Sequence, residues 1–333
     1  MSESSLTAPD SSPSSAAESA SATESANATE SASAAKLRSL RVAILVINRD
    51  QPEMTDSVVE QVRDMAPDLE TELFVVECGS SRQGRSQYAT HWFRDPSYRG
   101  RYYGFNRALD IAQKHAKKHG AFDYYWFVVN DIIFPAGQDV LVELLEVMEE
   151  NPRMAAIGPG EPDSDDYEGC HPKPGRRWHK ASTVHGLAWL MSAKAIAEVG
   201  YCSRKFRYSQ GASTELAYKL YKAGWFLAYS DVATLEHRGT STYGKVVKIS
   251  RHEYLRRSRD FATKYFVKTY GENWDELFSS VLTDDVEIDM FPIQRKIWEK
   301  KFKKERGNLW FWKTGSWVKQ RLLTLLGKKR EDA

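Results

Sequence analysis

The stretch YYWFVVNDIIFP, residues 124–135, decides the fold class and points to the site. Six apolar residues end at Asn130-Asp131, and three more apolar residues follow before Pro135. This pattern predicts a buried strand with one carboxylate at its carboxyl end. An ionised Asp beside so much apolar surface loses hydration that a metal, a cation or several donors must replace. Because ligands sit at this end of the strands in open α/β sheets, we expect Asp131 to mark a ligand site.

The segments around this stretch predict alternating strands and helices. Apolar runs predict strands at 41–47, 72–77, 124–129, 154–157 and 231–235, and helical periodicity predicts helices at 52–65, 102–118, 138–150 and 216–221. Alternation of this kind predicts a largely parallel sheet covered by helices.

Composition and charge restrict the class of protein. The chain has 333 residues, of which 41% are hydrophobic and 28% are charged, which suits one large domain or a domain with an appendage. No run approaches the about 18 apolar residues of a membrane-spanning helix. The three cysteines, Cys78, Cys170 and Cys202, have no paired spacing, which argues against a disulfide framework and is typical of a reducing cytosol. We therefore expect a cytoplasmic protein.

Residues 1–36 are rich in Ser, Ala, Thr and Glu, and we expect them to form a disordered tail. They lack the basic start and the apolar segment of a signal peptide. The first 35 residues carry five acidic side chains and no basic one, so the remaining chain holds 47 basic residues against 40 acidic ones. This modest positive charge suits an anionic ligand or surface.

No glycine-rich loop of the Walker or dinucleotide type follows any predicted strand, so an ATPase or a simple dehydrogenase is disfavoured. The chain instead resembles the nucleotide-binding half of family 2 glycosyltransferases with the GT-A fold. The resemblance is carried by residues 41–47, 75–80 and 127–135, and then by 189–192, 199–200, 222–225 and 236–241, which are similar in order to the family's acceptor half. It implies a mixed, mostly parallel, Rossmann-like sheet flanked by helices.

The resemblance implies that a nucleotide-sugar donor binds at the strand ends with a divalent cation, Mg²⁺ or Mn²⁺. Asp131 matches the last carboxylate of the family's Asp-x-Asp motif, beside Asn130, and Val129 stands at the first position. Asp131 and His237 would share the cation with diphosphate oxygens. With one carboxylate missing, metal binding could be weak or dispensable, and Asp131 could instead cap the following turn.

Three further residues are implied on the donor side. Glu77 and Ser80 fall where the family contacts the nucleobase and the ribose, with Glu in place of the usual Asp. The alternative for both is a solvated strand end. Arg107 falls near the family's diphosphate-binding pattern, and its alternative is a surface residue.

The catalytic base is where the chain departs most from the family. Residues 212–215 fall on the motif that holds the base, and the expected position is Ser213, which is far too weak a base at neutral pH. Glu215 is our candidate for the base. The alternatives are Asp163, Asp165 or Asp166 in the preceding loop, or a protein that no longer catalyses. Glu215 could also simply stabilise the first turn of a helix.

His185 and Trp189 lie in the expected acceptor half, where an aromatic ring could stack on a sugar, although a Trp in an apolar run is usually core. The loop 158–180 is long enough to be a functional flap. Its Cys170, His171 and His179 have no recognised zinc spacing.

We expect a GT-A domain over residues 37–245 and a basic, Trp-rich helical extension over 246–333. Residues 293–330 hold thirteen Lys or Arg against two Glu, and several Trp and Leu. Such a segment, here 290–330, could lie on the inner face of an anionic membrane, or it could form a helical cap. No base-reading motif accompanies the charge, so nucleic acid is not an expected partner.

The expected function is an inverting, metal-assisted glycosyltransferase of the kind used in polysaccharide biosynthesis. It would move a sugar from a nucleotide-sugar donor to a glycan or lipid-linked acceptor. Donor, acceptor, linkage and oligomeric state do not follow from the sequence. Two alternatives remain: a non-catalytic GT-A-like protein that binds nucleotide sugar or glycan, and a membrane-surface assembly factor that acts through the basic C-terminal helices.

Overall fold

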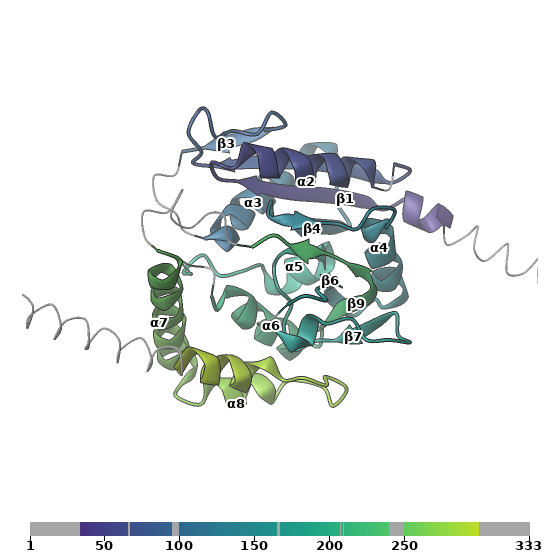
Figure 1. Cartoon of the computed structure of the whole chain (residues 1–333). Coiled ribbons are helices and arrows are strands. Elements are labelled where there is room, and N and C mark those ends of the chain that lie inside the picture. The colour runs from purple at the N-terminus through teal and green to yellow at the C-terminus, as the bar shows by residue number, and fades with distance from the viewer. Residues whose placement is uncertain are drawn as a thin grey trace, which may run out of the picture.

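An eight-stranded sheet with the strand order β3-β2-β1-β4-β8-β6-β9-β7 forms the centre of the computed structural model (Figure 1). The structure describes residues 34–65, 67–94, 100–164, 167–206, 208, 210–239 and 250–299. The strands are β1 (Arg41–Asn48), β2 (Glu70–Cys78), β3 (His91–Phe93), β4 (Tyr124–Val128), β6 (Met154–Gly160), β7 (Trp178–Lys180), β8 (Ala188–Ser192) and β9 (Phe226–Thr234). A separate two-stranded sheet consists of β5 (Ile132–Ile133) and β10 (Glu236–His237).

Helices cover the sheet. They are α2 (Pro52–Asp64), α3 (Arg101–His119), α4 (Val140–Glu150), α5 (Ala193–Val199), α6 (Ala212–Lys222), α7 (Arg251–Tyr270) and α8 (Trp274–Ser279), with a short 3₁₀ helix η1 (Glu168–Cys170). The expected mixed, mostly parallel sheet flanked by helices is confirmed. Antiparallel pairing is confined to β8, which lies between β4 and β6, to the edge strand β7 and to the small sheet.

The topology creates a crevice beside β1. This strand pairs in parallel with β2 on one side and with β4 on the other, so the chain reverses its direction of travel across the sheet at β1. Right-handed crossovers in opposite directions place α2 and α3 on opposite faces, and Figure 1 shows α2 in front of the sheet and α3 behind it. The carboxyl ends of β1 and β4 lie side by side at this reversal, and the crevice outside such strand ends is where α/β sheets bind ligands.

Burial on both faces of the sheet explains why the sequence of β4 is a continuous apolar run. Trp126 packs beside Phe134, and the neighbouring Phe127 packs on the other face against Phe105 and stacks on Tyr201 at 4.5 Å between ring centroids. All five β4 residues are buried. The strand ends where the chain becomes polar, so Asn130 and the residue after it stand at the crevice.

Several elements differ from the sequence expectation, among them β9, which begins at Phe226, five residues before the predicted strand 231–235. The short edge strands β3 and β7 were not predicted, because three residues show no periodicity. Helix α6 begins at Ala212, four residues before the predicted start, directly after Gly211, whose φ is +88°. A Cβ at Gly211 would lie 2.7 Å from the ring of Phe206 and 2.8 Å from Ala262, so glycine permits both the turn and the close contact with α7.

The first part of the C-terminal extension packs on the main core. Phe266 of α7 is fully buried among Phe206, Trp274, Phe278 and Trp298, and these residues belong to the same hydrophobic core as the sheet. Within the described part of the chain, none of the helices combines the length and the apolarity that crossing a bilayer requires. The predicted tail up to residue 33 and residues 300–333 lie outside the described residues, so membrane contact by 290–330 stays a prediction.

The substitution Phe266→Ala tests whether the extension and the sheet share one core. Removing a buried Phe side chain should cost about 3–5 kcal/mol of the free energy of unfolding. Urea denaturation followed by tryptophan fluorescence should show one transition, shifted as a whole to lower urea. Leu277→Ala, which truncates an exposed side chain on α8, is the control. A separate early transition, with the main one unmoved, would show that the extension is an independent unit.

Candidate functional site

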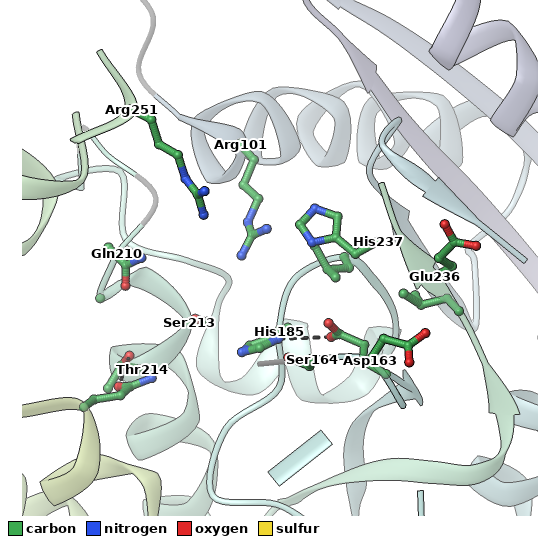
Figure 2. A pocket seen from close by; sticks show the side chains of 15 residues that line it. Arg101, Asp163, Ser164, His185, Gln210, Ser213, Thr214, Glu236, His237 and Arg251 are labelled. Carbon is green, nitrogen blue, oxygen red and sulfur yellow. Dashed lines mark hydrogen bonds and ion pairs between the residues drawn. The ribbon is translucent and has the colours of Figure 1, made fainter. Parts of the chain in front are cut away.

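A cavity of about 370 Å³ opens at the carboxyl ends of the central strands. Its lining combines residues from α3, the end of β6, the loop before β8, the start of α6, β10 and the start of α7 (Figure 2). The polar residues that line it are Arg101, Glu161, Asp163, Ser164, His185, Gln210, Ser213, Thr214, Glu236, His237, Arg251 and Gln294. The volume lies within the range of small-molecule sites.

Asp131 and His237 meet at the edge of this cavity. The antiparallel pairing of β5 with β10 aligns His237 with Ile132, and the backbone N–H of Arg238 donates to the carbonyl oxygen of Asp131 (2.8 Å). The side chains then approach to 3.3 Å between His237 Nε2 and Asp131 Oδ2. Asn130, the neighbour of Asp131, turns its amide toward α2 and donates to Thr55 Oγ1 (2.9 Å).

The separation of these two side chains fits a shared cation. Two adjacent ligands about 2.1 Å from an octahedral Mg²⁺ or Mn²⁺ lie about 3.0 Å apart, close to the observed 3.3 Å. Both side chains are partly exposed, so water or phosphate oxygens could complete the coordination shell. The structure therefore places the two predicted ligands together, and their role in metal binding stays a prediction.

Two arginines that the sequence analysis missed line the same cavity. Arg101 is the first residue of α3 and Arg251 is the first residue of α7. In Figure 2 both guanidinium groups project into the cavity, whereas the carboxylates of Asp163 and Glu236 lie on the side away from them. A helix N-terminus favours anions through its backbone N–H groups and its dipole. The cavity thus has a cationic wall. The sequence feature that could have predicted it is the Arg at the first position of both α3 and α7.

Arg107, the predicted donor-side arginine, is exposed and lies elsewhere on α3. Its guanidinium packs over the rings of Phe93 (5.7 Å) and Tyr103 (5.6 Å), and it does not line the cavity. This placement matches the surface alternative.

Glu77 and Ser80 hold the loop at the ends of β1 and β2. The carboxylate of Glu77 is fully buried and accepts from the amide of Asn48 (3.1 Å to each oxygen) and from the backbone N–H of Ser86 (2.8 Å). Ser80 Oγ accepts from the backbone N–H of Asp50 (3.0 Å). These donors offset the cost of burying the charge. In this arrangement both side chains shape the loop, and direct contact of either with a nucleoside stays a prediction.

Glu215 lies under the helical extension and not in the cavity. Its Oε1 accepts from the hydroxyls of Tyr265 (2.9 Å) and Tyr270 (2.6 Å), and Lys219 Nζ lies 3.1 Å from Oε2. Burial, and then the hydrogen bond to Glu215, raise the pKa of Tyr270, which keeps its hydroxyl protonated as a donor. Helix α6 turns Ser213 toward the cavity instead. This burial argues against the predicted role of Glu215 as the base.

Trp189 is also a core residue. It is buried on β8 with its ring centroid about 6 Å from those of Tyr102, Phe127 and Tyr201. This packing argues against the predicted stacking on an acceptor sugar. His185, the other acceptor-side residue, does line the cavity.

Glu161 and His185 form a pair that the sequence analysis missed, because they are 24 residues apart. Glu161 directly follows β6, and its Oε1 lies 3.0 Å from His185 Nδ1. Cys170 lies close enough to complete a metal-binding group. However, burial raises the pKa of the Cys170 thiol to about 12, and its Sγ donates to the carbonyl oxygen of Tyr167 (2.9 Å). In this arrangement the thiol acts as a hydrogen-bond donor within the flap.

The predicted flap contributes Asp163 and Ser164 to the cavity wall and is held at its far end by other segments. Lys173 and Arg176 both form ion pairs with Glu287 of the C-terminal extension. His179 Nδ1 lies 2.7 Å from Asp231 Oδ1, and both side chains are buried. Asp165 and Asp166, two of the alternative bases, lie outside the described residues. The flap is therefore anchored to β9 and to the extension.

Comparison with known proteins finds likeness at the level of structure alone. The chain matches no protein-family model and no curated protein sequence. It is similar to the mannosyltransferase PcManGT from Pyrobaculum calidifontis in complex with GDP-Man and Mn²⁺, with 12% identity and a TM-score of 0.48 over 72% of this chain and 73% of that one. It is also similar to GalNAc-T7 with UDP, GalNAc and Mn²⁺, with 11% identity and a TM-score of 0.47 over 78% of this chain and 57% of that one. At these values the similarity concerns the fold alone, and the ligands of neither protein are attributed to this chain.

Glu215→Ala should destabilise the protein strongly. The substitution removes a buried carboxylate and leaves two partly buried tyrosine hydroxyls without their acceptor, and breaking a buried charged network costs about 3–5 kcal/mol of the free energy of unfolding. Chemical denaturation measures the loss. Glu272→Ala, which removes an exposed carboxylate just after α7, is the control. An unchanged unfolding midpoint for Glu215→Ala would contradict the structural role.

Glu287→Gln should loosen the flap. Hydrogen bonds from Lys173 and Arg176 hold the pKa of Glu287 at about 2, below its ordinary value of 4.5. This tether, the pair of ion pairs that Glu287 forms with Lys173 and Arg176, is therefore fully formed above pH 4.5. It is lost as the pH falls toward 2. Hydrogen–deuterium exchange of residues 171–177 should be faster in the variant at neutral pH. Asp284→Asn, a nearby exposed acid, should leave exchange unchanged. Equal exchange in Glu287→Gln and the wild type would rule out the tether.

Proposed function

We propose that the chain is a metal-assisted glycosyltransferase that moves a sugar, with inversion, from a nucleotide-sugar donor to a hydroxyl of a glycan or lipid-linked acceptor. The observation that carries the proposal is the approach of Asp131 to His237, at 3.3 Å, beside the crevice between β1 and β4. The resemblance of residues 40–244 to family 2 glycosyltransferases supports it.

The donor diphosphate would lie between the cation and the cationic wall. Asp131 and His237 would hold Mg²⁺ or Mn²⁺, which when bound stabilises the negative charge that develops on the leaving diphosphate. Arg101 and Arg251 face the same space from two helix N-termini. Two guanidinium groups offer planar, charged donors suited to phosphate oxygens. They would therefore bind the diphosphate oxygens whose negative charge a single cation does not neutralise.

The nucleoside would lie over the loop that Glu77 and Ser80 shape. That loop follows β2, on the opposite side of β1 from β4, so it borders the same crevice. The acceptor would enter from the side of His185 and Ser213, which line the cavity. The donor is thus assigned to the nucleotide half of the sheet and the acceptor to the half built on β6, β8 and β9.

A second candidate function is a nucleotide-sugar-binding protein without catalysis. It is favoured by two departures from the family, Val129 in place of a carboxylate and Ser213 in place of the base. Such a protein would bind the donor and show no turnover with any acceptor. The two functions therefore agree on binding and differ on transfer.

The purified protein should be stabilised by a UDP- or GDP-sugar in the presence of Mn²⁺. A ligand that binds the folded state alone adds about 2.7 kcal/mol when present at 100 times its Kd, and a thermal-shift screen with and without Mn²⁺ detects this. Asp131→Ala should abolish the Mn²⁺ dependence, because it removes one of the two proposed protein ligands. Asp64→Ala, which removes an exposed carboxylate of α2, is the control. No stabilisation by any nucleoside diphosphate or nucleotide sugar would refute the proposal.

A further inference from the structure

The pair formed by Glu161 and His185 lies in the cavity and is separate from Asp131 and His237, the two residues proposed to bind the cation. Glu161 Oε1 lies 3.0 Å from His185 Nδ1, and the carboxylate is almost fully buried, with 8% of its side chain exposed. An ionised carboxylate can only accept, so Nδ1 carries the hydrogen. In the neutral imidazole, the free electron pair then resides on Nε2.

The surroundings hold this ring in one orientation. The backbone N–H of His185 donates to the hydroxyl of Tyr229 (2.6 Å), and the ring of Tyr167 packs against the imidazole at 4.2 Å between centroids. Gly186 presses against α3, where a Cβ would lie 2.8 Å from the ring of Tyr102. Glu161 is fixed in turn, since its backbone N–H donates to the carbonyl oxygen of Cys170 (2.8 Å).

The Nε2 atom of His185 faces the open part of the cavity. Figure 2 shows His185 projecting toward the start of α6, where Ser213 and Thr214 lie. His185 Nδ1 is paired with Glu161, whereas Nε2 has no hydrogen-bond partner among the described residues. Ser213 stands at the position where the family resemblance expects the base, so His185 points at the place where a proton acceptor is needed.

We propose that His185 is the general base for the acceptor hydroxyl and that Glu161 is its positioning residue. This inference rests on the proposed glycosyl transfer. The acceptor O–H bond breaks and its proton passes to His185 Nε2. The oxygen electron pair forms the new bond to the anomeric carbon, while the bond from that carbon to the diphosphate oxygen breaks and the nucleoside diphosphate leaves with the electron pair.

The other candidates for this role are weaker. Glu215 is buried beneath α7, and the hydroxyl of Ser213 is far too weak a base. Asp163 lines the cavity but is exposed. The pair also reproduces the arrangement in which an acid fixes the tautomer of a catalytic histidine.

The test compares variants of the full-length protein in two assays. Binding is measured by thermal shift with UDP, GDP and their sugars plus Mn²⁺. Turnover is measured as nucleoside diphosphate release in the presence of a panel of octyl glycosides as acceptor probes. His185→Gln should keep the wild-type thermal shift and KM for the donor, and its kcat should fall about 10²–10⁴-fold. His119→Gln, an exposed histidine at the far end of α3, should match the wild type.

Two further variants separate catalysis from structure. In His185→Ala, added imidazole should restore part of the lost turnover, which a merely structural role would not permit. Glu161→Gln should lower kcat while leaving the donor KM unchanged, because the ring loses its orientation and not the donor site. Asp163→Asn removes the other carboxylate that faces the cavity from the flap, and its kcat should fall less than that of His185→Gln.

The outcomes distinguish this inference from the function on which it rests. No binding of any nucleotide sugar by the wild type would overturn both. Binding without turnover by the wild type would overturn the inference and leave the donor site standing. The inference alone would be overturned if His185→Gln kept the wild-type turnover. It would also be overturned if Asp163→Asn, and not His185→Gln, lost turnover. So would a His185→Ala variant that loses donor binding and is not rescued by imidazole.

Discussion

The pairing of β5 with β10 is the constraint on which the rest of the site depends. Each strand has two residues, yet their ladder joins the segment after β4 to the segment after β9. Because His237 aligns with Ile132, its ring reaches the side chain of Asp131 across the pair. A single carboxylate beside an apolar strand thereby gains a second polar group from a distant part of the chain. The pairing thus brings together the two side chains that we propose as cation ligands, although Val129 is apolar.

The charges of the cavity are divided between its walls. Arg101 and Arg251 stand at helix N-termini on one side, whereas Glu161 and Asp163 stand at the end of β6 and in the flap. A displacement with inversion requires the leaving group and the nucleophile on opposite faces of the reacting carbon. Positive charge suits the departing diphosphate, and a proton acceptor suits the entering hydroxyl. The division of charge agrees with the direction of transfer that we propose.

The sequence predicted what depends on local pattern and missed what depends on tertiary packing. Strands β1 and β4 are buried on both faces, so their continuous apolar runs identified them, and Asp131 stood out against that background. The pair of Glu161 and His185 has no sequence signal, because β6 and the loop before β8 meet only in the folded sheet. Glu215 was assigned to the cavity since its acidity was visible, whereas the tyrosines of α7 that bury it come at least 50 residues later.

The orientation of α6 explains why Glu215 is not placed to act as the base in the transfer that we propose. Successive residues of an α-helix are rotated by about 100°, so Ser213 and Glu215 project on opposite sides of the helix. Ser213 lines the cavity, whereas Glu215 faces α7 and accepts hydrogen bonds from Tyr265 and Tyr270 of that helix. Bringing Glu215 to the cavity would require turning α6 and breaking that buried network. A proton acceptor that faces Ser213 is therefore supplied more readily from another element, and His185, already held by Glu161, is so placed.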